Sequence, residues 1–122
     1  MTTDNKLPEE KTVAQRALEL LKEVPADKFL NGEYTNGQDA CCSVGHYKRL
    51  TSKDPSDFSR PNCDDYGFSD LRARSEHFLS NVHYTVADIA TVNNSNWING
   101  YTEPEIKDRV IHLLEDMVKA GY

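Results

Sequence analysis

The chain has 122 residues, of which 38% are hydrophobic and 28% charged, and its formal net charge is −6. One domain fits this length, and no apolar run reaches the roughly 18 residues that a membrane-spanning helix needs. Basic residues are scattered, which disfavours nucleic-acid binding, because that requires clustered Lys and Arg to displace phosphate counterions. The cysteine count is odd and no secretory signal is evident, so we expect free thiols and a cytoplasmic location.

The apolar residues recur at helical spacing and predict an all-α fold, a compact bundle of about five short helices with one long irregular loop. We expect residues 1–7 to form a disordered tail and residues 8–122 to form a single helical domain. The first helix is predicted to begin near Pro8, which suits a first helical turn, and to end before Pro25.

A second helix is predicted over about 40–50, and the long loop follows it over 51–68. A loop of this length is often either functional or a tolerated insertion, and both interpretations stay open. Within it, the carboxylates of Asp64 and Asp65 could bind a hard cation, although solvated charge is the default interpretation.

Three further helices are predicted in the C-terminal half. One covers about 69–80, and the next opens at Thr85, where Asp88 three residues later completes a capping-box pattern. The last is predicted to begin at Thr102, to present one continuous apolar stripe, and to end at Gly121. Between these last two helices, Trp97 is expected to insert into the core.

Two segments together resemble a known family. The first is a glycine turn that leads into a Cys-x-x-Gly helix, with Cys42 and Gly45 at the matching positions. The second is a helix that ends at Asn93-Asn94 and is followed by a loop and an amphipathic helix. This order is similar to that of small bacterial and bacteriophage helical proteins without an assigned activity. The family has aspartate where this chain has Asn94, which weakens any acid–base role there. The resemblance implies an all-α fold and a bacterial or phage setting, with no activity attached.

Cys42 and His46 are the strongest candidates for chemistry. Positions four apart share a helix face, so thiol and imidazole could meet, and such a pair can bind zinc or activate a thiolate. Cys63 could supply a further ligand, but the spacing lacks the pattern of a metal site. Packing of the thiol in the core is the favoured interpretation, and we expect no catalytic residue, no bound metal and no cofactor.

The leading hypothesis for function is a small accessory protein that binds a protein partner, with neither nucleic acid nor membrane involved. One alternative is a metal-dependent or cysteine-based enzyme centred on Cys42 and His46. Another is a homodimeric structural protein that buries its apolar helix faces between two copies. Six residues are the candidate binding residues on this view: Cys42, His46, Cys63, Asp64, Asp65 and Trp97.

Overall fold

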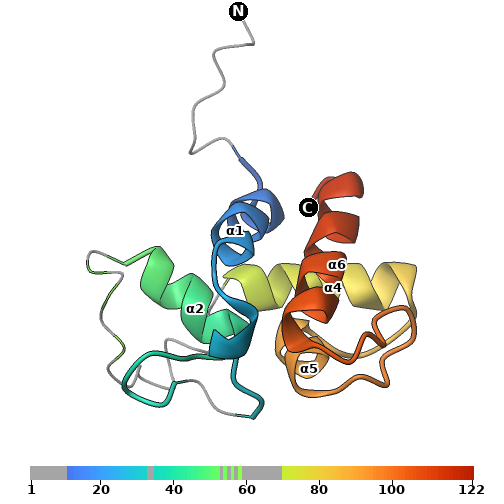
Figure 1. Cartoon of the computed structure of the whole chain (residues 1–122). Coiled ribbons are helices and arrows are strands. Elements are labelled where there is room, and N and C mark those ends of the chain that lie inside the picture. The colour runs from blue at the N-terminus through green and yellow to red at the C-terminus, as the bar shows by residue number, and fades with distance from the viewer. Residues whose placement is uncertain (1–10, 33–34, 53, 55, 57, 59–69) are drawn as a thin grey trace, which may run out of the picture.

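The computed structural model describes residues 11–32, 35–52, 54, 56, 58 and 70–122. Within them the chain forms five α-helices and one short 3-10 helix, and no β-strand longer than an isolated bridge (Figure 1). This confirms the predicted all-α bundle. The elements in chain order are α1 (Val13–Lys22), η3 (Ala26–Lys28), α2 (Ser43–Leu50), α4 (Asp70–Val82), α5 (Ile89–Asn94) and α6 (Ile106–Lys119).

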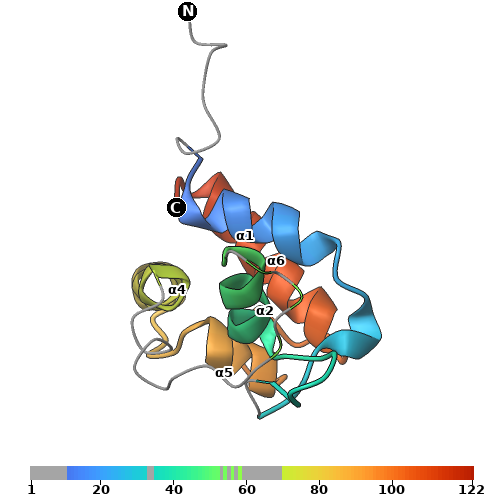
Figure 2. The ribbon, with the colours of Figure 1, turned by 90° about the vertical axis from the view of Figure 1, so that its left-hand side faces the viewer.

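The helices pack around two contact centres, α1 and α5. Each of these two helices contacts α2, α4 and α6, so that the other three lie between them (Figures 1 and 2). The most extensive pairing joins α1 to α6, which run alongside each other in Figure 2. Burial of the apolar stripes of all five helices against one another gives a single core. Its largest fully buried apolar side chains are Leu21, Val44, Leu71, Leu79, Ile89, Val92, Ile98, Tyr101, Leu113, Leu114 and Met117.

The first helix begins later than the sequence predicts. Thr12 is its N-cap, because the Thr12 hydroxyl accepts a hydrogen bond of 3.1 Å from the Gln15 N–H, so the expected start near Pro8 is wrong. The helix ends at Lys22, before Pro25, as predicted. The expected tail over 1–7 and most of the 51–68 loop lie outside the described residues.

The two C-terminal capping predictions were displaced by three residues. Asp88 itself is the N-cap of α5 and forms a reciprocal capping box with Thr91, so the helix does not open at Thr85. Likewise, α6 begins at Ile106 after Glu105, and not at Thr102. The buried Arg109 explains the second displacement, since its guanidinium binds carbonyls of the segment before the helix and holds that segment non-helical.

Two large apolar side chains are on the surface, and one of them, Trp97, was expected in the core. Val86 is 91% exposed and Trp97 is 71% exposed, whereas Ile98 and Tyr101 fill the interior beside them. The prediction failed because the loop after α5 buries the residues that follow its tryptophan. None of the helices in the described part of the chain has the length and apolar character needed to cross a membrane.

Candidate functional site

His46 lies in the core at the start of α2, where both ring nitrogens have partners. The Arg49 Nε–H donates to His46 Nδ1 over 3.0 Å, which leaves the ring proton on Nε2. Nε2 then donates to the Lys28 carbonyl oxygen at 2.7 Å. Burial is the main cause that lowers the pKa of His46 from 6.5 to about 4, so the ring is neutral at pH 7. Through its hydrogen bond to the Lys28 carbonyl, the His46 side chain joins α2 to η3.

The thiols next to His46 are also buried. Cys42 is the N-cap of α2, and its sulfur accepts a hydrogen bond of 3.5 Å from the Gly45 N–H. Burial raises the pKa of the thiols of both Cys41 and Cys42, which disfavours the reactive thiolate. Cys42 is extended and precedes the first residue of α2, so the prediction that it shares a helix face with His46 is wrong. Each of the two side chains has its own structural partner, and neither is open to solvent.

The other predicted site residues do not join this pair. Cys63, Asp64 and Asp65 lie outside the described residues. Trp97 lies on the surface, and so it shares no solvent-accessible site with the buried Cys42 and His46. Among the described side chains, no three His, Cys, Asp or Glu residues converge as metal ligands.

Asn93 is a structural residue of this region whose role the sequence did not reveal. It is fully buried, and its Oδ1 accepts a hydrogen bond of 2.9 Å from the Ser43 N–H at the first turn of α2. Its Nδ2 donates to the Leu30 carbonyl at 2.8 Å. Arg109 completes the region by donating to the carbonyls of Val92 and Asn93, at the end of α5. The paired asparagines predicted a helix end, but no local pattern identified their distant partners.

A second polar cluster, which we call the Tyr101 chain, comprises His83, Tyr101, Glu103, His112 and Asp116. The Tyr101 hydroxyl donates to Asp116 Oδ2 at 2.8 Å and lies 3.0 Å from His83 Nε2. His112 Nδ1 lies 2.7 Å from Glu103 Oε2, and its Nε2 lies 3.4 Å from Asp116 Oδ2. The ring of Tyr101 packs edge-on against both imidazoles, with centroid distances of 5.2 and 4.9 Å.

The Tyr101 chain holds the loop before α6 in place between the end of α4 and α6. Burial, helped by the hydrogen bond to Asp116, raises the pKa of Tyr101 well above its ordinary value, so the phenol stays protonated. A surface pocket of about 700 Å³ opens beside Glu103 and His112. One basic side chain of its lining, Lys107, already donates to two carbonyls at the end of α1. The cluster thus ties the loop before α6 to the end of α4 and to α6 itself.

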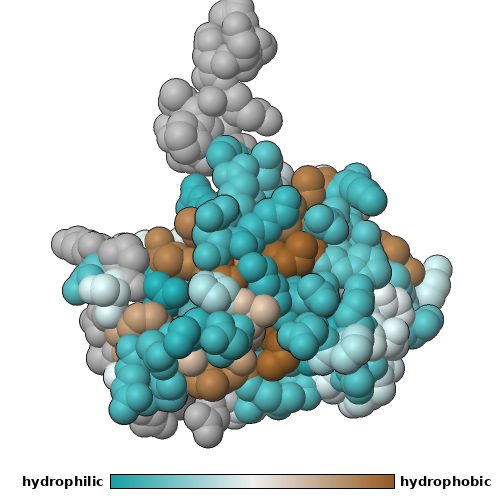
Figure 3. Space-filling model, in the orientation of Figure 1, coloured by the Kyte–Doolittle hydropathy of each residue, from teal (hydrophilic) through white to brown (hydrophobic). Residues whose placement is uncertain are grey.

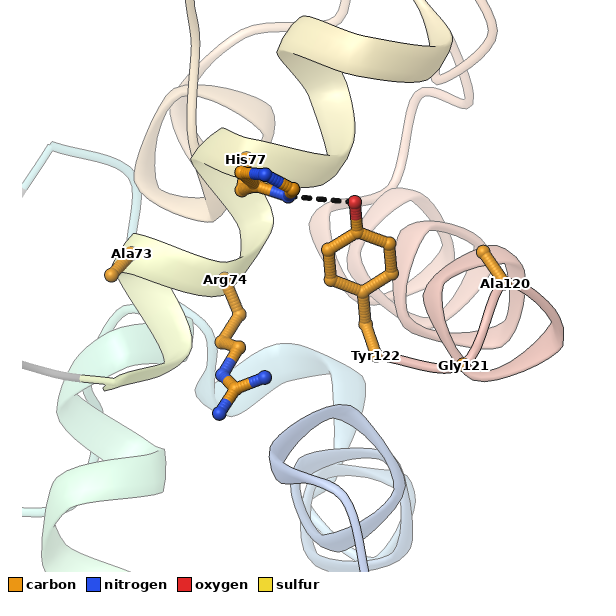
Figure 4. A pocket seen from close by; sticks show the side chains of 6 residues that line it. All are labelled: Ala73, Arg74, His77, Ala120, Gly121 and Tyr122. Atoms are coloured by element: carbon orange, nitrogen blue, oxygen red, sulfur yellow. Dashed lines mark hydrogen bonds between the residues drawn. The ribbon is translucent and has the colours of Figure 1, made fainter.

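A different pocket, of about 510 Å³, lies between α4 and the end of α6 (Figure 4). His77 Nδ1 and the Tyr122 hydroxyl lie 2.7 Å apart, and Arg74 extends from the preceding turn of α4 toward α1. Small residues, Ala73, Ala120 and Gly121, make up the rest of the lining. The pocket therefore offers one cation and one histidine–tyrosine pair.

The large apolar side chains that the described residues expose are concentrated on two segments. They are Val82 at 49%, Tyr84 at 89%, Val86 at 91% and Trp97 at 71% exposure, and we call them the Tyr84–Trp97 surface. Figure 3 shows scattered pale and brown residues among hydrophilic ones at the right of the view, where Figure 1 places the end of α4.

The two segments of this surface are held together by His83. Its ring packs against Tyr101, and a Cβ placed on Gly100 would lie only 3.3 Å from His83 Cε1. A tight turn between Ile98 and Tyr101 fixes the loop that carries Trp97. Comparisons of the chain with protein families, with curated proteins and with solved structures give no match.

Proposed function

We propose that this chain binds a protein partner and that the Tyr84–Trp97 surface is the docking site. The observation that carries the proposal is the exposure of two aromatic and two branched apolar side chains on adjoining segments. Single exposed apolar residues are ordinary on a protein surface, but a group of them in one region is typical of an interaction site. Tryptophan and tyrosine are also the residues that most often dominate binding energy in interfaces.

The support beneath this surface favours the same function. The backbone of Tyr84 has a φ of +54°, a left-handed conformation that is uncommon for a residue with a side chain. Such conformations persist where the surrounding structure imposes them, and they are concentrated at functional sites. The hydrogen bonds of the Tyr101 chain hold the adjoining loop. A surface fixed in this way loses little conformational entropy when a partner binds.

The setting that we propose is the one implied by the family resemblance, a bacterial cell or a bacteriophage. The alternative of an enzyme centred on Cys42 and His46 has less support, because both side chains are buried and have structural partners. A homodimer remains the competing interpretation of the exposed apolar residues.

The proposal is tested by capturing partner proteins on three versions of the chain, each used as a bait. The baits are the wild-type chain, the double variant Tyr84→Ser/Trp97→Ser, and a control, Gln38→Ser, which changes an exposed residue outside this surface. Circular dichroism first establishes that all three are equally folded. We expect one protein to be retained by the wild type and the control and lost from the double variant. Equal retention on all three baits, or retention on none, would contradict the proposal.

Light scattering provides the second measurement. If the surface binds a second copy of the chain, the wild type and the control will have twice the mass of the double variant. That result would replace the proposed partner with self-association.

A further inference from the structure

The Tyr84–Trp97 surface belongs to a part of the chain without basic residues. Residues 75–106 include neither Lys nor Arg, although the whole chain has 14 of them, and they include the carboxylates of Glu76, Asp88, Glu103 and Glu105. Both Glu76 and Glu105 are exposed. The exposed aromatic and branched side chains thus belong to a segment whose own formal charges are all negative, and of these Asp88 is paired with Arg72.

More negative charge lies beneath the same region. The carboxylate of Asp116 accepts a hydrogen bond from the Tyr101 hydroxyl. The Tyr101 ring packs against His83, which lies in the sequence between the exposed Val82 and Tyr84. One oxygen of Glu103, Oε1, is buried and has no hydrogen-bond partner among the described residues. These carboxylates add to the negative potential that a docking partner meets.

From this combination we infer that the partner docks a segment that carries apolar side chains together with Lys or Arg. This inference rests on the proposed function and names the chemistry of the partner. Apolar side chains would cover Val82 and Val86, while cations would pack on the exposed rings of Tyr84 and Trp97, which attract them through the electrostatic field of the ring face. The net charge of −6 would attract such a segment from a distance.

The same charges disfavour other occupants. A nucleic acid would bring phosphates to a segment that has no Lys or Arg of its own, and the Arg72 guanidinium that reaches it already pairs with Asp88. A second copy would bring another net charge of −6 and the same acidic segment into contact. A basic, apolar segment of a different protein is the class that both the charge and the hydrophobicity of the surface fit.

The experiment uses the fluorescence of Trp97, which is the only tryptophan of the chain and belongs to the surface itself. The full chain is titrated with three short capped peptides of equal length, made of alternating Leu-Arg, Leu-Glu or Ser-Arg. We expect a saturable change in emission with the Leu-Arg peptide. The Leu-Glu peptide should bind about tenfold more weakly, as the loss of two ring–cation contacts worth about 1.4 kcal/mol together would give. The Ser-Arg peptide should also bind more weakly, because it lacks the apolar side chains. Added salt should weaken the Leu-Arg interaction.

Variants make this result specific to the surface. Tyr84→Ser should weaken the binding of the Leu-Arg peptide, and the control Gln38→Ser should leave the affinity for this peptide unchanged. Equal binding of Leu-Glu and Leu-Arg would overturn the role of charge, and a strong response to Ser-Arg would overturn the apolar component. No response to Leu-Arg, when partner capture has succeeded, would overturn this inference while the proposed function stands. A change in emission with chain concentration alone would indicate a second copy instead.

Discussion

Acidification is expected to destabilise the folded chain through His46. The folded ring has a pKa of about 4, mainly because it is buried and also because the Arg49 guanidinium lies beside it, while the hydrogen bond to the Lys28 carbonyl opposes this shift. The unfolded ring has the ordinary value of 6.5. Between these two values the unfolded chain binds a proton that the folded chain does not. The free energy of unfolding therefore falls as the pH is lowered from 6.5 toward 4, and this residue contributes no slope above 6.5.

The magnitude follows from the same two values. Each pH unit inside the window removes about 1.4 kcal/mol, so complete passage removes about 3 kcal/mol. A domain of this size has a total stability on the order of 5–15 kcal/mol, so the loss is a substantial fraction. Other histidines and carboxylates also bind protons on acidification, and a matched variant is needed to separate them.

His46→Gln is that variant. The glutamine amide can still donate a hydrogen bond toward the Lys28 carbonyl, but it does not titrate. Urea denaturation followed by circular dichroism, repeated between about pH 4 and pH 7, should show that the wild type loses about 3 kcal/mol more than the variant. Parallel losses in the two proteins would refute the reasoning, as would an NMR titration of folded His46 with a pKa near 6.5.

Three further predictions concern other buried groups. Tyr101→Phe removes the hydroxyl that donates to Asp116 and should lower the free energy of unfolding by about 1–3 kcal/mol in urea denaturation; unchanged stability would mean that this hydrogen bond contributes nothing. Arg109→Met leaves several buried carbonyls without a donor and should cost about 3 kcal/mol in the same assay, while a stability equal to the wild type would contradict its role. Cys41 and Cys42 should resist an alkylating reagent in the native chain and react in urea, as peptide mass spectrometry will show; equal rates in both conditions would show that the thiols are accessible.

Helical periodicity predicted the architecture because it depends on local spacing. The apolar residues of the last helix, among them Val110 and Leu113, recur every three or four positions, and the structure buries them as one stripe. Helix starts were less predictable, since several capping residues compete within a few positions. Thr85 and Asp88 both fit an N-cap, and the choice of Asp88 depends on tertiary contacts, including an ion pair of 2.9 Å with Arg72.

The candidate site was less accessible to sequence reasoning than the fold. Trp97 was predicted to lie in the core, because its hydrophobicity outweighed any local signal for exposure, and the structure places it on the surface. The grouping of Tyr84 with Trp97 depends on a loop that folds back onto His83, and no periodic pattern encodes such a return. The partners of His46 and Asn93 are likewise distant in sequence, so the residue types alone could not reveal them.

The hydrogen bond from Ser43 to Asn93, two residues that are fifty positions apart in the chain, links the stability of α2 and α5. With eight residues, α2 is too short to persist alone in water. The Ser43 N–H in its first turn has its hydrogen-bond acceptor, Asn93, only when the end of α5 packs against α2. Loosening α5 should therefore unravel α2 as well. Amide hydrogens in these two helices should exchange with solvent as one cooperative unit. A substitution that destabilises either helix should therefore speed amide exchange in both.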